Sequence, residues 1–159
     1  MATYERSDRV AAPLAEVWAF HSTERGLVEL TPDWMGLHIE SVRGPDGEPD
    51  PEVLEVGSTL DVSVRPFGVG PRQGWTSEIT EREHDGTSAY FRDVMREGPF
   101  EHWEHTHSFF ADGDETVFRD TIEYQFPLGR LGETLGLFGV VGFEPMFRYR
   151  HWQTKRLLG

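Results

Sequence analysis

Residues 103–126 read WEHTHSFFADGDETVFRDTIEYQF, and this stretch decides the fold class. At its centre, residues 112–115 (DGDE) are of the types that favour a tight turn. On either side apolar and polar residues alternate, which is the pattern of a strand with one buried face. The stretch therefore predicts an antiparallel hairpin in which Ala111 lies opposite Thr116.

This register assigns one set of side chains to the inward face of the hairpin. The expected cross-strand pairs are Phe109 with Phe118, His107 with Asp120, His105 with Ile122, and Trp103 with Tyr124. The opposite, solvated face is expected to carry His102, Glu104, Thr106, Ser108, Arg119, Thr121, Glu123 and Gln125. Two imidazoles and a carboxylate are thus expected among aromatic, inward-facing side chains, where polar groups need partners to offset desolvation.

The preceding hairpin extends the same inward face. If its turn is the three-residue loop 84–86 (HDG), with Gly86 in the left-handed conformation, both strands contribute inward side chains. These are Trp75, Ser77 and Ile79 on one strand and Phe91, Asp93 and Met95 on the other. Asp93 is therefore a second inward carboxylate.

The rest of the chain predicts a strand, two short helices, further strands and a long terminal helix. Residues 3–10 have strand composition, a helix opens at Pro13, and a second helix ends before Pro32. Further strands are expected at residues 35–42, 59–65, 74–82, 87–95, 100–111 and 116–126, and a helix at 131–158. We expect a bend or break in this last helix near Pro145.

This order of elements predicts an α+β architecture, with an antiparallel sheet curling around the terminal helix. The loop 44–51, with three prolines and three acidic residues, is expected to be solvated and not a domain linker. We therefore expect one domain over residues 1–159. The concave side of such a sheet must be filled by side chains or by a ligand.

Composition excludes several classes of function. The 159 residues carry a formal net charge of -13, so nucleic acid and anionic membranes are poor partners. The chain contains no cysteine, which excludes disulfides, thiolate zinc sites and cysteine nucleophiles. Only Lys155 among the 15 basic residues is a lysine, which is typical of a GC-rich genome or of a high-salt cytoplasm.

No targeting or spanning segment is expected. Residues 1–10 lack the apolar core of a signal peptide, so a cytoplasmic location is the default prediction. The longest apolar stretch, residues 131–147, is interrupted by two glutamates, a proline and four glycines, which a membrane helix does not normally carry.

Three interpretations apply to His105, His107 and Asp120. They would hold a divalent metal as a two-histidine, one-carboxylate set, or act as a general acid/base pair in which Asp120 raises the pKa of His107. The interpretation we favour is that they orient a polar group of a ligand inside an apolar cavity, or only satisfy one another, without metal or cofactor. The residues expected to bind the ligand are Trp75, Ile79, Phe91, Asp93, Trp103, His105, His107, Phe109, Phe118, Asp120, Ile122 and Tyr124.

Short motifs spread over nearly the whole chain carry a family resemblance. They are VAAP at 10–13, VWAF at 17–20, LTP at 30–32, FRD at 91–93, GPF at 98–100, WEHTHSF at 103–109, DTIEYQFPLG at 120–129 and FRYRH at 147–151. In this order they resemble the START-related SRPBCC superfamily, which includes polyketide cyclase/dehydrase-like proteins. The resemblance implies a helix-grip fold of about seven curved antiparallel strands with a deep cavity. It implies no single reaction, and the iron-binding motif of its oxygenase members is not matched.

Three functional hypotheses follow. The first is binding or transport of a lipid, polyketide, isoprenoid or aromatic molecule between the sheet and residues 131–158, with Gly136 and Gly139 in a gate. The second is a cofactor-independent cyclase or dehydratase that uses His107, Asp120 and His105 for proton transfer. The third is a regulatory interaction protein whose cavity is vestigial.

Overall fold

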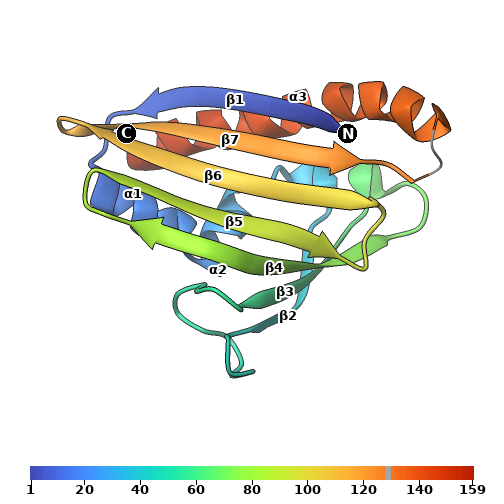
Figure 1. Ribbon diagram of the computed structural model, residues 1–159, viewed down its shortest axis with the longest axis horizontal. Helices are drawn as coiled ribbons and strands as arrows, with labels where there is room; N and C mark the ends of the chain where they lie inside the picture. Colours follow the sequence, from blue (N-terminus) through green and yellow to red (C-terminus); the bar gives the residue numbers. More distant parts are fainter. Residues whose placement is uncertain (128–129) are drawn as a thin grey trace.

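The computed structural model describes residues 1–127 and 130–159, with side chains described throughout except at 130–142. Its strands are β1 (Ala2–Val10), β2 (His38–Arg43), β3 (Thr59–Val64), β4 (Gln73–His84), β5 (Ser88–Arg96), β6 (His102–Asp112) and β7 (Glu115–Gln125). They form one antiparallel sheet in the order β1-β7-β6-β5-β4-β3-β2 (Figure 1). Each strand from β2 to β6 thus pairs with the strand that follows it in the chain, and β1 pairs with β7.

The helices lie together on one face of this sheet. Two short ones, α1 (Leu14–His21) and α2 (Glu24–Leu30), follow β1, and the long α3 (Arg130–Leu158) follows β7. In Figure 1 all three lie behind the same face of the sheet. Two single turns of 3-10 helix, η1 (Asp33–Met35) and η2 (Pro66–Gly68), flank β2 and β3. This is the predicted α+β helix-grip arrangement, a curved sheet around a long C-terminal helix.

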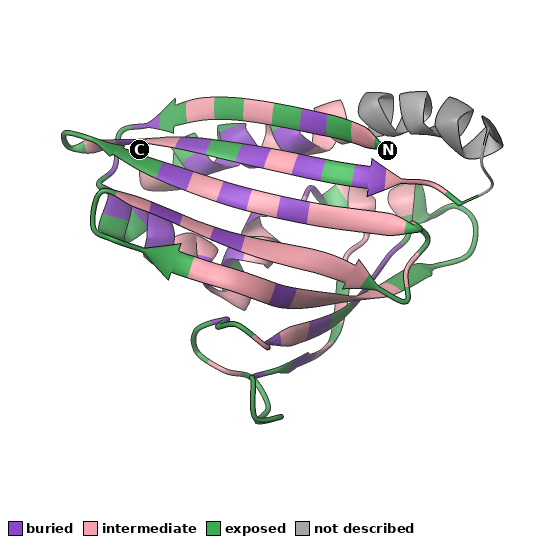
Figure 2. Cartoon of the chain, viewed as in Figure 1, coloured by how far each residue is buried: buried purple, intermediate pink, exposed green. Residues whose placement is uncertain are grey.

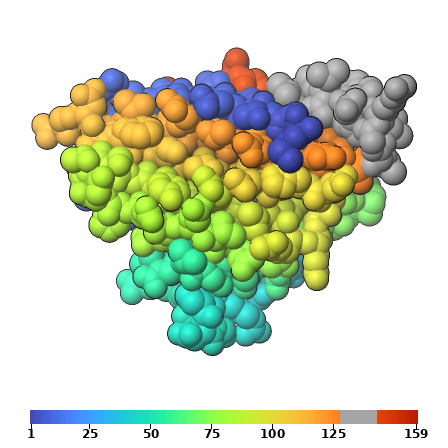
Figure 3. Space-filling model, in the orientation of Figure 1, coloured from blue at the N-terminus to red at the C-terminus, as the bar shows by residue number. Residues whose placement is uncertain are grey.

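The β6–β7 hairpin has the predicted register. Ala111 lies opposite Thr116, His107 opposite Asp120, and Trp103 opposite Tyr124. Buried residues alternate with more exposed ones along both strands (Figure 2). The outer face seen in Figure 3 is the predicted solvated one, and the β2–β3 region projects from its lower edge.

The β4–β5 hairpin keeps the predicted inward set but not the predicted turn. The strands are separated by residues 85–87, one position later than expected, because the Asp85 carboxylate accepts hydrogen bonds from the backbone of Thr87 and Ser88. A bulge follows, since Arg82 pairs with Phe91 but Ile79 pairs with Asp93. The extra residue restores the alternation, so the six predicted side chains share one face.

The start of β2 and the course of α3 differ from expectation. The strand expected from residue 35 starts at His38, because η1 and the left-handed Gly36 (φ 60°) precede it. Helix α3 is continuous through Pro145, so no break occurs there. The predicted gate at Gly136 and Gly139 lies outside the residues whose side chains are described. No helix within the described residues is long and apolar enough to cross a membrane.

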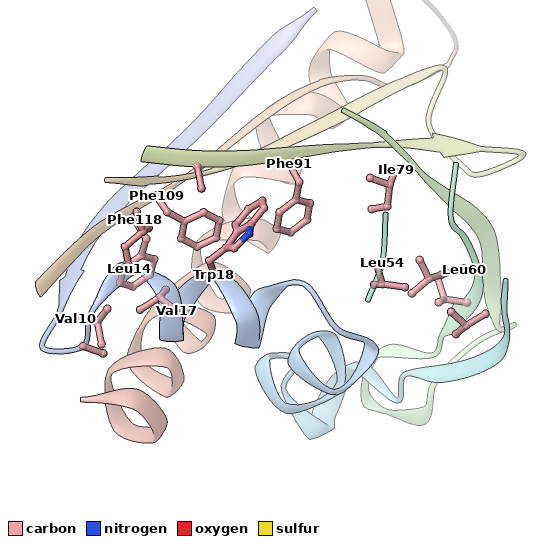
Figure 4. Close-up of a cluster of buried hydrophobic side chains, with 14 residues drawn as sticks. Val10, Leu14, Val17, Trp18, Leu54, Leu60, Ile79, Phe91, Phe109 and Phe118 are labelled. Atoms are coloured by element: carbon pink, nitrogen blue, oxygen red, sulfur yellow. The ribbon is translucent and has the colours of Figure 1, made fainter. Parts of the chain in front are cut away.

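The core lies between the sheet and the helices. Trp18 of α1 packs against Phe91 and Phe109, with ring centroids 6.0 and 5.8 Å away (Figure 4). Ile79, Leu54 and Leu60 lie farther along the sheet in the same view. A second cluster joins Tyr4, Ile122, Tyr124 and Phe147 under α3. The two clusters pack the helices against the concave face of the sheet.

Candidate functional site

A cavity of about 810 Å³ occupies the concave side of the sheet. Its wall is formed mainly by apolar side chains from the helices and from β3 to β6: Leu27, Leu30, Leu60, Val62, Val64, Ile79, Phe91, Met95, Trp103, Phe143, Met146 and Phe147. Ligand pockets in proteins typically enclose about 300–1,000 Å³ and have such walls with a few polar groups. The cavity therefore has the size and chemistry of a small-molecule site.

An aromatic pair marks the opening of the cavity. Trp34 of η1 and Phe67 of η2 both line it, and their rings stack 5.0 Å apart. Phe67 is 74% exposed and sits in the left-handed region at φ 57°, which costs free energy for a residue with a side chain. Phe67 thus lies where the cavity wall meets solvent, as do the exposed wall residues Gln73, Pro99 and Pro145.

The predicted ligand-binding residues divide into two groups. On the cavity wall lie Trp75, Ile79, Phe91, Asp93, Trp103, His105 and His107. On the same inward face, but away from the wall, lie Phe109, Phe118, Asp120, Ile122 and Tyr124. The second group is covered by the helices: Phe109 packs on Trp18, and Tyr124 packs on Phe143 of α3.

Buried histidines and aspartates form a hydrogen-bonded network at the cavity wall. His105 Nε2 lies 2.7 Å from Asp120 Oδ1, and His107 Nε2 lies 2.9 Å from Asp93 Oδ2. His151 of α3 completes the set, with its Nε2 2.6 Å from Asp120 Oδ2. Because ionised carboxylates only accept hydrogen bonds, each of these ring nitrogens carries a proton. The sheet is thus tied to α3 through Asp120.

The hydrogen bonds run diagonally across the sheet. The backbone register sets His107 opposite Asp120 and His105 opposite Asp93, yet each imidazole bonds the other carboxylate. His107 Nδ1 lies 3.3 Å from Asp120 Oδ1 without the alignment of a hydrogen bond. The two imidazoles stack with centroids 3.6 Å apart, and Phe91 stacks on His107 at 4.0 Å. This stacking fixes both rings.

The network drives the pKa values of the two neighbouring imidazoles apart. Burial lowers the pKa of His105, and the charge of His107 lowers it further, against the effect of Asp120. Burial also acts to lower the pKa of His107, but the carboxylates of Asp120 and Asp93 outweigh it and raise that pKa above its ordinary value. Neighbouring groups with opposed shifts are a common basis for acid and base roles. His107 is therefore the imidazole that takes up a proton first.

The carboxylates stay ionised. Burial would raise the pKa of Asp120, but hydrogen bonds from His105 and His151, together with the nearby imidazole of His107, outweigh it and hold that pKa well below its usual range. The pKa of Asp93 is likewise lowered, because its bonds with His107 and Ser77 and the charge of His105 outweigh burial. Two negative charges thus lie beneath the imidazoles at physiological pH.

His21, to which the sequence assigns no role, also lines the cavity. Its lowered pKa should make the stability of the protein depend on pH. Burial is the main cause that lowers its pKa to about 3; Arg150 adds to this, and the bond to Val17 O opposes it. As the pH falls through about 6.5, the unfolded chain gains a proton that the folded protein excludes. The free energy of unfolding should thus fall by about 2 kcal/mol between pH 7 and pH 5 through His21.

Urea unfolding of His21→Gln at both pH values checks this expectation. The variant should lose less stability than the wild-type protein on acidification, by about 2 kcal/mol. His38→Gln, at an exposed position, is the matched control and should follow the wild-type protein. Equal pH slopes for wild type and His21→Gln would refute the buried, neutral state of His21.

Three of the cavity residues have the geometry of a metal-ligand set. The ligand atoms of Asp93, His105 and His107 lie within 4.8 Å of one another. The carboxylate in this set is Asp93 and not Asp120, which the sequence analysis considered, because Asp120 is turned toward α3. Each of the three groups also has a hydrogen-bond partner within the network, so the geometry alone does not require an ion.

Two residues of α3 belong to this site but were not predicted. His151 is the second imidazole on Asp120, and Arg150 lines the cavity. Phe143, Phe147 and Arg150 follow one another at helical spacings of four and three residues, and His151 is four residues from Phe147. This periodicity was the signal in the sequence that could have placed them on the inward face.

Comparisons with known proteins agree with this geometry. A family model described as "Polyketide cyclase / dehydrase and lipid transport" matches residues 10–140. A search of the curated proteins finds no significant match.

Several solved structures share the fold at low sequence identity. Norcoclaurine synthase from Thalictrum flavum has a TM-score of 0.67 at 18% identity, over 98% of this chain and 85% of that chain. A START superfamily protein from Mycobacterium smegmatis has a TM-score of 0.62 at 15% identity, over 98% of each chain. The protein TTHA0849 from Thermus thermophilus has a TM-score of 0.63 at 16% identity, over 96% of this chain and 97% of that chain. At these identities the likeness shows the fold.

Proposed function

The chain belongs to the polyketide cyclase/dehydrase and lipid transport family, and on this premise we propose that it binds a small hydrophobic molecule. The ligand occupies the cavity between the sheet and α3, and its class is a lipid, polyketide, isoprenoid or aromatic compound. The observation that carries the proposal is the 810 Å³ cavity with its apolar wall. Such a volume favours a ligand over a vestigial cavity in a regulatory interaction protein.

Burial of apolar surface supplies the affinity. A ligand that loses about 300 Å² of apolar surface to the cavity gains about 7 kcal/mol, part of which is offset by its lost freedom of movement. His105 and His107 lie on the wall, where they meet the polar end of the ligand. Asp120 holds the ring of His105 from behind, and Asp93 holds that of His107. Norcoclaurine synthase, which shares the fold, was solved in complex with dopamine and hydroxybenzaldehyde, so this architecture accommodates aromatic molecules.

A neutral fluorophore tests the proposal. N-phenyl-1-naphthylamine emits strongly only in apolar surroundings, and we expect it to bind the wild-type protein saturably at one site. Val62→Trp places an indole on the cavity wall and should weaken this binding at least about tenfold, because it removes space and apolar contacts.

Val94→Trp is the matched control. Val94 follows the cavity residue Asp93 along β5 and therefore points to the outer face of the sheet. This variant should bind the fluorophore like the wild-type protein. Equal affinities in wild type and Val62→Trp, or absence of binding to the wild-type protein, would reject the cavity as the binding site.

A second candidate function is proton transfer on a bound carbonyl compound. The observation that favours it is the pair of stacked imidazoles on the cavity wall, with pKa values shifted in opposite directions. His107 would exchange a proton with the substrate. Asp93 would position its ring, and Asp120 would position the ring of His105 beside it. This chemistry is that of a cyclase or dehydratase without a cofactor.

A further inference from the structure

Arg150 is a buried cation without a counterion among the described residues. It lies on α3, is 9% exposed and lines the cavity. Its Nε is enclosed without a hydrogen-bond partner, and none of its side-chain nitrogens bonds a described residue. The Phe147 ring lies 5.9 Å from the guanidinium carbon.

The two carboxylates of the histidine network, Asp93 and Asp120, already have other partners. Asp120 accepts from His105 and His151, and Asp93 accepts from His107 and Ser77. The ion pairs of both carboxylates are with histidines and not with Arg150. By contrast, Arg6, which lies near the surface, pairs with Glu144 at 2.9 Å.

A guanidinium in this position is costly unless something compensates it. Arginine stays charged in proteins, so it does not escape burial by losing its proton. Its donors are fixed in a planar fork that matches a carboxylate, and an unpaired charge out of water is strongly unfavourable. The terminal nitrogens of Arg150 are not among the enclosed atoms, so a compensating group can reach them from the cavity.

We propose that Arg150 binds a carboxylate of the ligand, so that the natural ligand is an apolar carboxylic acid. This inference rests on the ligand-binding function proposed above. Arg150 is the one lysine or arginine among the described residues of the cavity wall, which suits a single negative charge better than a phosphate. Phe147 connects Arg150 to His105, whose ring it meets edge-on at 5.4 Å, so the carboxylate end lies beside the histidine network.

Competition between a carboxylate and its ester tests the proposal. Laurate and methyl laurate share one apolar chain, and each is titrated against N-phenyl-1-naphthylamine bound to the wild-type protein. A charge-assisted pair with Arg150 should let laurate displace the fluorophore at about ten- to a hundredfold lower concentration than the ester. Arg150→Met keeps the length and apolar stem, and in this variant the two competitors should become equal within about twofold.

Arg148→Met is the matched control. Arg148 lies on the same helix but is exposed and paired with Glu144, so this variant should keep the preference for laurate. Binding of the fluorophore itself should be unchanged in Arg148→Met, and in each protein the two competitors are compared against the fluorophore affinity of that same protein. If wild type does not prefer laurate, or Arg150→Met retains the preference, the role of Arg150 is wrong while the cavity function stands. Failure of the fluorophore to bind wild type would reject the cavity function itself.

Thermal unfolding without ligand gives an independent readout. Removal of an uncompensated buried charge should leave the melting temperature of Arg150→Met equal to or above that of wild type. Laurate should raise the melting temperature of wild type more than that of the variant. A variant that melts well below wild type would show that Arg150 is compensated within the protein, and would overturn the proposal.

Discussion

Replacement of Asp120 by asparagine is expected to lower the free energy of unfolding by about 3–5 kcal/mol. Asp120 is 6% exposed and accepts hydrogen bonds from His105 and His151, which join β6 to α3. An asparagine offers one accepting oxygen, so a buried imidazole N–H would face the amide NH₂ without an acceptor. Urea unfolding at pH 7 measures the loss.

The pH dependence of this loss separates electrostatics from packing. The raised pKa of His107 contributes stability that is fully present below pH 6.5 and is lost as the pH rises through the folded-state value. Because Asp120 contributes to that shift, the gap between wild type and Asp120→Asn should be larger at pH 6 than at pH 9. The lowered pKa of Asp120 itself contributes above about pH 4 and is lost only in stronger acid.

Asp114→Asn is the control for this measurement. Asp114 is exposed in the turn between β6 and β7, so its replacement should change stability by no more than about 0.5 kcal/mol. If Asp120→Asn were as stable as this control, the network would not hold the sheet to α3.

Replacement of His107 by glutamine is expected to abolish proton exchange on a bound ketone. The probe is 2-tetralone in D₂O, whose α-protons exchange through an enolate. In the proposed reaction the α C–H bond would break as its proton passes to the imidazole, and a deuteron would return to the same carbon from the exchanged ring. Loss of a positioned acid/base group should slow this exchange by about 10²- to 10⁴-fold, measured by NMR.

The same experiment distinguishes ligand binding from proton-transfer catalysis. His107→Gln should still bind N-phenyl-1-naphthylamine within about twofold of wild type, because the apolar wall is unchanged. His84→Gln, at an exposed position, should keep the exchange rate. A wild-type protein that exchanges 2-tetralone no faster than buffer would reject proton transfer and leave ligand binding as the function.

The inward face of the sheet was predictable because strand geometry is local. The turn at residues 112–115 fixes the β6–β7 register, and with period-two alternation this places His105, His107 and Asp120 on one face. The β4–β5 face was also predictable, although its turn was not. The bulge near Thr80 offsets the shifted pairing beside the turn, where His84 lies opposite Ala89. Patterns within one hairpin therefore sufficed for this half of the site.

Partners from distant segments were not predictable in the same way. His107 bonds Asp93 and not its cross-strand partner Asp120, because side-chain rotamers and the stacking of two imidazoles decide between neighbours on a sheet. His151 and Arg150 enter the site because α3 crosses the concave face, and the crossing depends on tertiary packing. Their helical spacing indicates one buried face but not what that face meets.

The central claim is that a hydrophobic molecule enters the space between the sheet and α3. Methyl NMR spectra with one equivalent of N-phenyl-1-naphthylamine test it most directly. If the ligand occupies this space, the signals of Leu60, Val62 and Ile79 on the cavity wall should shift and saturate. Those of Val10 and Val17, in the packed core, should stay in place. Unchanged wall signals, or shifts confined to the outer-face residue Val94, would show that the molecule does not bind in the cavity.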